Sequence, residues 1–187
     1  AATNTTWSLR RRVFEARNLG RYRLSARIGE GGHGEVWRAY HPGMRQEVAI
    51  KVLRSEVSED ERALGRFERE IEALCKLRHP HTIRILDYGV TTDGVCYYAM
   101  ELLEGMTLAH LVHAQGPLEP SRVIHFALQI ASALSEAHQH GIVHRDIKPA
   151  NVFVLSSEAA ADYAKLLDFG VAKMQGDGQI TRTGMVV

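Results

Sequence analysis

Two kinds of hydrophobic pattern follow one another along the chain, and the change falls near its middle. In the first half, apolar and β-branched residues form short runs separated by glycine-rich or Pro-Gly turns, a pattern that predicts β-strands. The predicted strands cover Tyr22–Ile28, Gly34–Tyr40, Glu47–Leu53, Thr82–Tyr88 and Val95–Glu101.

One helix is predicted among these strands. Ser58 and Glu61 have the spacing of a capping box, in which the two side chains bind free backbone N–H groups at a helix start. Apolar residues then recur every three or four positions as far as Leu77, and His79-Pro80 ends the pattern. The first half therefore predicts five strands and one helix.

The second half is mainly helical. Thr107–Gln115 has the pattern of a short helix with a threonine N-cap, and Val123–His140 that of a longer helix closed by Gly141. Apolar residues cover more than one side of the longer helix, so it is predicted to be buried on several sides. We expect the chain that covers it to lie beyond Val187.

Composition narrows the function classes. The 187 residues carry a net charge of +1, which provides no basic field for nucleic acid or an anionic membrane, and no nucleic-acid partner is expected. Cys75 and Cys96 have no CxxC spacing, which favours free thiols in the cytoplasm. No apolar run is long enough to cross a bilayer, so membrane association is expected only through regions outside this chain.

The segment at residues 1–20 precedes the first predicted strand. Arg10-Arg11-Arg12 is interspersed with apolar residues, which permits two interpretations: an amphipathic segment on a membrane surface, or a linker or extra helix. We favour a linker or N-terminal extension, and the domain is then predicted to cover residues 21–187.

A glycine-rich motif joins the first two predicted strands. It reads Gly29-Glu30-Gly31-Gly32-His33-Gly34-Glu35-Val36, and glycines let a hairpin backbone lie close over phosphate groups. A dinucleotide-binding site would need the glycines between a strand and a helix, which is not the predicted order. A phosphate-covering hairpin and a plain flexible turn both remain open.

The strongest chemical signal is a polar cluster in the second half. It reads His144-Arg145-Asp146-Ile147-Lys148-Pro149-Ala150-Asn151, followed by Asp168-Phe169-Gly170. Carboxylate and carboxamide oxygens are ligands that suit Mg²⁺ better than zinc. The cluster therefore contains the groups needed to hold metal ions on a nucleotide and to direct a hydroxyl at its last phosphate.

With Val48-Ala49-Ile50-Lys51 upstream, these motifs stand in the order typical of protein kinases. The chain resembles the bacterial eukaryotic-like (Hanks-type) serine/threonine protein kinases over about residues 20–187. The resemblance implies an α+β, two-lobed fold. A five-stranded antiparallel N-lobe with one helix is expected at 21–100, a hinge at 101–105, and a partial, mainly helical C-lobe at 106–187 that lacks its C-terminal part.

The same resemblance implies transfer of the ATP γ-phosphoryl group to Ser/Thr hydroxyls of protein substrates, with autophosphorylation in signal transduction. Asp146 would orient the hydroxyl and Lys148 neutralise the transferred phosphate. Lys51 would contact the phosphates and pair with a glutamate of the helix, for which Glu70 is favoured over Glu68.

The implied cofactors are ATP and Mg²⁺, with Mn²⁺ as a substitute, and the implied metal ligands are Asn151 and Asp168. The implied nucleotide contacts are Ile28, Gly29, Gly31, Gly34, Val36, Ala49, Lys51, Met100, Glu101, Leu103 and Phe153.

Further roles are implied for packing and regulation. His144, Phe169, Leu74 and Ile85 resemble the internal stack that links the lobes of an active kinase. Arg145 resembles the arginine that anchors a phosphorylated loop. Thr181 and Thr183 are predicted phosphorylation sites, modified within a kinase–kinase dimer.

Two other functions compete. A pseudokinase scaffold or inactive nucleotide-binding fragment predicts loss of Lys51, Asp146, Asn151 or Asp168, and all four are present. A small-molecule phosphotransferase shares a catalytic Asp and Asn but typically lacks the His-Arg-Asp and Asp-Phe-Gly combination found here. We expect the 187-residue chain alone to be inactive or to bind nucleotide poorly.

Overall fold

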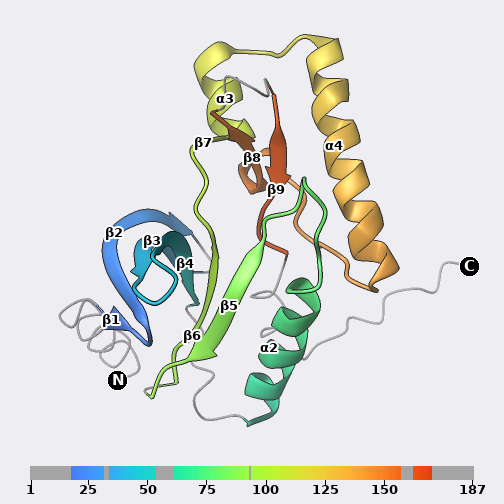
Figure 1. The fold of residues 1–187 in the computed structure, drawn as a ribbon. Helices are drawn as coiled ribbons and strands as arrows, with labels where there is room; N and C mark the ends of the chain where they lie inside the picture. The colour runs from blue at the N-terminus through green and yellow to red at the C-terminus, as the bar shows by residue number, and fades with distance from the viewer. Residues whose placement is uncertain (1–17, 32–33, 54–60, 93, 157–161, 170–187) are drawn as a thin grey trace, which may run out of the picture.

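The computed structural model describes residues 18–31, 34–53, 61–92, 94–156 and 162–169, which form two lobes (Figure 1). The first lobe is an antiparallel sheet of strand order β1-β2-β3-β4-β6-β5 with a single helix, α2, beside it. The strands are β1 (Asn18–Leu19), β2 (Tyr22–Gly31), β3 (Gly34–His41), β4 (Gln46–Leu53), β5 (Ile85–Val90) and β6 (Cys96–Glu101).

All five strands expected from the sequence are present, but the strand predicted at Thr82–Tyr88 was placed too early, since β5 begins at Ile85, and β1 is a sixth strand. This two-residue edge strand pairs Leu19 with Tyr22, and Leu19 is only 1% exposed. The side chain of Leu19 belongs to a core cluster on one face of the sheet that includes Tyr22, Val48 and Ile50. The sheet therefore begins at Asn18, inside the segment predicted as an extension, because Leu19 completes this small core.

The opposite face of the sheet packs against α2 (Glu61–Leu74) and the second lobe. Phe67, Ile71 and Leu74 recur at helical spacing and are buried. The helix ends three residues before the predicted Leu77, because the chain turns at Cys75 and Lys76, but Leu77 remains buried at 3% exposure. The helical spacing of apolar residues therefore continues to Leu77, although the helix itself ends at Leu74.

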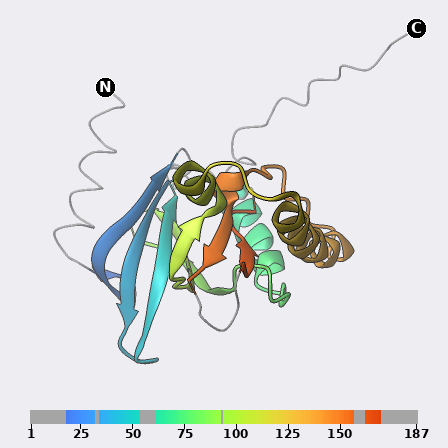
Figure 2. The ribbon, with the colours of Figure 1, turned by 90° about the horizontal axis from the view of Figure 1, so that it is seen from above.

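The second lobe surrounds a small antiparallel sheet of order β7-β8-β9. Figures 1 and 2 show β8 and β9 between α3 and α4. The elements are β7 (Gly105–Thr107), α3 (Leu108–Gln115), α4 (Pro120–Gln139), the 3₁₀ turn η2 (Pro149–Asn151), β8 (Val152–Leu155) and β9 (Ala164–Leu166). The predicted cap of α3 is present, since the Thr107 hydroxyl accepts a hydrogen bond from the His110 N–H.

Helix α4 is covered on one face within the described part of the chain. Phe126 and Ala133 are buried there, whereas Val123, Ile124 and Leu128 are 50%, 58% and 65% exposed. Burial of α4 on several sides, by chain outside the described residues, stays a prediction. None of the helices that the structure describes has the length and apolar character needed to span a membrane.

Candidate active site

Strand register assembles the N-lobe wall of the site. Val36 on β3 pairs with Gly29 on one side and with Lys51 on the other, and residues directly opposite one another share a face of the sheet. Ala49 lies on this face too, two residues before Lys51, and pairs with Met100. Five of the predicted nucleotide contacts therefore line one surface, which faces away from the Leu19 cluster.

Lys51 reaches from this wall to the second lobe. Its ammonium group lies 2.5 Å from Oδ1 of Asp168, and its side chain is only 7% exposed. Asp168 follows β9 directly in the chain, separated from Leu166 by one residue. The ion pair thus joins the predicted phosphate-binding lysine to a predicted metal ligand across the two lobes.

Glu70 is not brought to Lys51 in this arrangement. Among the described residues, Lys51 forms an ion pair with Asp168 and none with Glu70. Burial raises the pKa of Glu70, and the nearby positive charge of Arg145 opposes that rise. Glu70 as the partner of Lys51 therefore stays a prediction.

The turn after Ile147 holds Asp146 from two sides. Lys148 Nζ lies 2.8 Å from Asp146 Oδ2, and the Asn151 side-chain amide donates to the same oxygen at 3.0 Å. The Asn151 amide also donates to the Asp146 backbone carbonyl at 2.8 Å. The Asp146 side chain keeps 15% exposure, so its carboxylate is fixed in direction yet still reachable.

The same bonds show how Asn151 and Asp168 fit a divalent metal. Because both partners of the Asn151 NH₂ group are acceptors, the orientation of the amide is determined, and its oxygen is left for another ligand. The Leu167 N–H donates to the Asn151 carbonyl at 2.8 Å, which places Asn151 beside the chain segment that carries Asp168. A carboxylate and an amide oxygen match the hard oxygen ligands that Mg²⁺ takes together with nucleotide phosphates.

Two residues of this site have left-handed backbones. Arg145 has φ 61° and Asp168 has φ 50°, a region that costs a non-glycine residue roughly 1–3 kcal/mol. Both positions are directly beside or within the predicted catalytic groups. The surrounding contacts therefore hold the backbone where the free chain would not stay.

His144 anchors the loop from below. The centroid of its ring lies 4.7 Å from that of the Phe169 ring. Its Nδ1 accepts a hydrogen bond from the Asp146 N–H, and its Nε2 lies 2.7 Å from the Leu167 carbonyl oxygen. These partners require the neutral tautomer with hydrogen on Nε2. Burial lowers the pKa of His144, in agreement with a neutral ring. Phe169, Leu74 and Ile85 are also buried, as the predicted stack requires.

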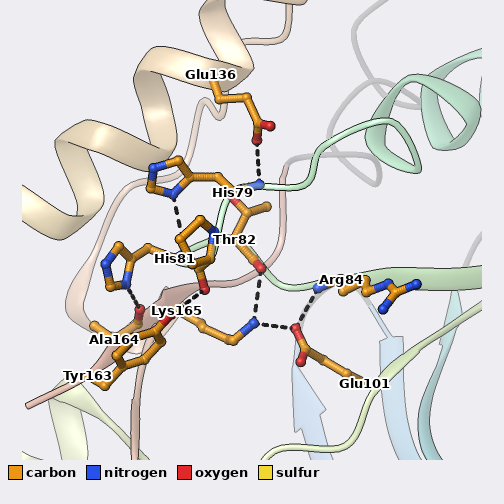
Figure 3. A network of polar contacts seen from close by, with 10 residues as sticks. His79, His81, Thr82, Arg84, Glu101, Glu136, Tyr163, Ala164 and Lys165 are labelled. Atoms are coloured by element: carbon orange, nitrogen blue, oxygen red, sulfur yellow. Dashed lines mark hydrogen bonds and ion pairs between the residues drawn. The ribbon is translucent and has the colours of Figure 1, made fainter. Parts of the chain in front are cut away.

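The predicted hinge is supported from behind by Glu101 (Figure 3). Its carboxylate oxygen Oε1 accepts hydrogen bonds from Lys165 Nζ at 2.6 Å and from the Arg84 backbone N–H at 2.8 Å. The Glu101 N–H in turn donates to the Arg84 carbonyl. The backbone around Glu101, from which the adenine contacts are predicted, is thereby tied to both β9 and the segment that precedes β5.

That preceding segment is also attached to α4 (Figure 3). The Glu136 carboxylate accepts hydrogen bonds from the backbone N–H groups of Arg78 and His79, at 2.9–3.2 Å. The imidazole of His81 contacts the Ala164 carbonyl at 2.8 Å. Residues 78–84 therefore connect the hinge, β9 and α4 in one polar network.

The remaining predicted contacts are distributed unevenly. Gly34 needs to be glycine, because its φ is 145° and a Cβ would overlap the Val52 carbonyl, whereas a Cβ at Gly31 would meet nothing. Ile28 is half-exposed at 50%, and Phe153 is partly buried on β8. Leu103 follows β6 and packs partly against the main core. Thr181, Thr183 and the loop tip at His33 lie outside the described residues.

Comparison with known proteins agrees with this geometry. The family described as "Protein kinase domain" matches residues 22–186. The chain belongs to the protein kinase family. This family uses ATP and a divalent metal in general.

The curated relatives that this chain matches include bacterial serine/threonine-protein kinases. The chain is 42% identical over 170 residues to serine/threonine-protein kinase pkn3 of Myxococcus xanthus, covering 89% of this chain and 31% of pkn3. It is 39% identical to serine/threonine-protein kinase PknH of Mycobacterium bovis, covering 90% of this chain and 28% of PknH.

A crystal structure of the PknI kinase domain of Mycobacterium tuberculosis superposes with TM-score 0.73 at 33% identity, covering 83% of this chain and 61% of that one. A structure of Rad53 in complex with AMP-PNP superposes with TM-score 0.70 at 26% identity, covering 86% of this chain and 42% of that one. The chain thus spans about a third or less of the two curated relatives' length and about three fifths of the PknI domain.

Two site-supporting residues were not foreseen from the sequence. Lys165 is a charged residue in a short apolar strand, three positions before Asp168. That placement could have indicated that it has a charged partner near the site. Tyr98, whose hydroxyl donates to Asp168 at 3.2 Å, lies in a run of buried residues of β6. Its spacing in the sequence carries no sign of which carboxylate it would meet.

Proposed function

We propose that the protein is a serine/threonine protein kinase that transfers the γ-phosphoryl group of ATP to Ser/Thr hydroxyls of protein substrates. The observation that carries this proposal is the meeting of Lys51 and Asp168 across the two lobes, 2.5 Å apart, next to the Asn151 segment that fixes Asp146. A cation, a metal-ligand carboxylate and a second fixed carboxylate are the groups that phosphoryl transfer requires.

Each group has a distinct part in the reaction. Lys51 contacts the α- and β-phosphates and exchanges Asp168 for them when nucleotide binds. Asp168 and the Asn151 amide oxygen would hold Mg²⁺, or Mn²⁺ as a substitute, and the metal would neutralise charge on the phosphates. Asp146 accepts a hydrogen bond from the substrate hydroxyl and aligns it with the γ-phosphorus, while Lys148 offsets the negative charge that the transferred group carries.

Adenine is held by the face of the sheet opposite the Leu19 cluster. Val36 and Ala49 would cover one side of the base and Phe153 the other, and the Glu101 carbonyl and Leu103 N–H would meet its polar edge. Support for this comes from the hydrogen bonds that fix the Glu101 side chain, because they limit movement of the backbone that would contact the base.

We further propose regulation by autophosphorylation of Thr181 and Thr183 within a kinase–kinase dimer, with the kinase domain in the cytoplasm. Arg145 then binds the phosphorylated loop. Free thiols at Cys75 and Cys96 fit a reducing compartment. Mass spectrometry of the autophosphorylated protein should find phosphate at one or both threonines, and an unmodified loop would argue against this mode of regulation.

The test of the main proposal uses the full-length protein with radiolabelled ATP and Mg²⁺. Peptides that differ only in carrying Ser, Thr or Tyr should be labelled on Ser and Thr, and Lys51→Met should reduce labelling by roughly 100-fold or more. Lys76→Met is the matched control, because Lys76 is exposed in the turn after α2. Nucleotide binding without any transfer would favour the scaffold function, and labelling of an aminoglycoside in place of peptide would favour a small-molecule kinase.

A further inference from the structure

We infer that Tyr98 is a positioning residue for Asp168: its hydroxyl holds Oδ1 of the carboxylate and thereby leaves Oδ2 for the metal. The inference rests on the proposed function, since Asp168 is a metal ligand only in that reaction. It starts from a hydrogen bond of 3.2 Å between the Tyr98 hydroxyl and Asp168 Oδ1.

Strand register explains why Tyr98 reaches this carboxylate. Tyr98 on β6 is directly opposite Lys51 on β4, so the two side chains leave the sheet on the same face. Both donate to the same oxygen of Asp168, Lys51 at 2.5 Å and Tyr98 at 3.2 Å. Among the described residues, none donates to Oδ2.

The surroundings make Tyr98 a lasting donor. Its side chain is buried, with 4% exposure, so bulk water does not compete for the hydroxyl. Toward a carboxylate oxygen, which has no hydrogen to give, the hydroxyl can only donate. Tyr98 and Asp168 border a cavity of about 10 Å³, walled mainly by apolar side chains such as Leu74 and Ile85. A space of this size has room for about one water molecule.

Tyr98 and Lys51 differ in what they do once nucleotide is bound. Lys51 is the group that the phosphates attract, so its contact with Asp168 is exchanged during the reaction cycle. Tyr98 is neutral and enclosed, and its bond to Oδ1 can persist. A neutral donor orients the carboxylate without cancelling the negative charge that a metal ion needs, which is how partners of ligating carboxylates commonly act.

The test is Tyr98→Phe, which removes one oxygen atom and keeps the ring. In the full-length protein, binding of a non-hydrolysable ATP analogue is measured as a function of Mg²⁺ concentration, and again without metal. We expect the Mg²⁺ concentration at half-saturation to rise roughly tenfold, while metal-free nucleotide affinity stays within about twofold. Tyr97→Phe is the matched control, because Tyr97 is the neighbouring buried tyrosine on the opposite face of β6 and belongs to the Leu19 cluster; it should leave both quantities unchanged.

Three results would overturn the inference. An unchanged Mg²⁺ dependence in Tyr98→Phe leaves the proposed function standing and removes the role of Tyr98. If Tyr98→Phe loses nucleotide affinity equally with and without Mg²⁺, Tyr98 has a purely structural role. A wild-type protein whose nucleotide binding does not respond to Mg²⁺ contradicts the proposed function itself. Should Tyr98→Phe fail to fold, Tyr98→Met is the second variant, because it keeps an apolar side chain at this buried position and lacks the hydroxyl. It should show the same roughly tenfold rise in the Mg²⁺ concentration at half-saturation, and an unchanged Mg²⁺ dependence there would equally overturn the inference.

Discussion

Lys165 Nζ lies 2.6 Å from the Glu101 carboxylate, and this ion pair joins β9 to the last residue of β6. The two side chains are 14% and 25% exposed, so neither charge is well solvated. Three residues after Lys165 comes Asp168, and the residues after Glu101 form the predicted hinge. One contact thus relates the metal-binding segment to the adenine-binding segment.

Replacing Lys165 by Met should lower the free energy of unfolding by about 1–2 kcal/mol, because the Glu101 carboxylate would lose its charged partner in a partly buried position. Urea denaturation measures the change. Lys76→Met, at an exposed lysine, should shift stability by less than about 0.5 kcal/mol. Equal effects of the two variants would show that the ion pair does not stabilise the fold.

Asp146→Asn should lower kcat by roughly 10²–10⁴-fold, since the amide cannot accept the substrate proton as a carboxylate does. Nucleotide affinity should stay close to the wild-type value, because Asp146 is fixed by Asn151 and Lys148 and not by the adenine wall. Steady-state kinetics and equilibrium binding measure the two quantities separately. Glu119→Gln, at an exposed carboxylate before α4, is the control; retention of full kcat by Asp146→Asn would contradict the assigned role.

Stability should fall with acidification through His144. Burial lowers its pKa in the folded protein below the ordinary 6.5, so the unfolded chain binds the proton more readily. The stabilising contribution is complete above pH 6.5, and it declines as the pH falls from there to the lowered pKa of the folded state. His144→Phe keeps an aromatic ring against Phe169 but cannot titrate, and its stability should change less over this pH range.

Thermal denaturation at pH 7.5, 6.5 and 5.5 compares wild type with His144→Phe. His110→Gln is the control, because His110 is exposed on α3, and it should retain the wild-type decline. A steeper acid loss in His144→Phe than in wild type would refute the assignment of a neutral ring.

Arg122 links α4 to the turn before β9 through an ion pair with Asp162. Its Nε and Nη2 donate to the two oxygens of Asp162 at 2.6 and 2.7 Å, and this pairing lowers the pKa of Asp162. Arg122→Lys cannot form the two-pronged contact and should cost about 1 kcal/mol of stability at neutral pH. Arg84→Lys, at an exposed side chain, is the control.

The pH dependence of the Arg122 variant has a definite sign. A lowered carboxyl pKa stabilises the folded state above the ordinary Asp value of 3.8, and the contribution is lost as the pH falls through the lowered pKa. The stability difference between wild type and Arg122→Lys should therefore shrink in strongly acidic solution. A difference that grows on acidification would contradict the ion pair.

Local pattern was sufficient for most of the elements. Short runs of apolar and β-branched residues between turn residues predicted five of the six N-lobe strands, and the Thr107 cap located α3, because these signals act within a few residues of chain. The sixth strand and the end of α2 were not predicted. Leu19 joins β1 to the sheet through burial against residues far along the chain, and Leu77 continues the apolar spacing of α2 after the helix has ended.

Motif order was likewise sufficient to name the chemical groups, but not their partners. Lys51, Asp146, Asn151 and Asp168 could be selected because each belongs to a short motif of restricted spacing. Which charged groups form ion pairs depends on how the two lobes pack. In this structure Lys51 forms its ion pair with Asp168 and not with Glu70.

The sequence by itself thus determined most of the elements, the family resemblance and the reactive residue types, since these depend on contacts within a few positions of the chain. Only the tertiary structure decided that Tyr98 and Lys51 converge on one oxygen of Asp168, and that Lys165 supports Glu101 from behind. The physical reason is that strand register and lobe packing bring together side chains that are 47 or more residues apart in the chain. Contacts between such distant residues produce no periodic pattern in the sequence.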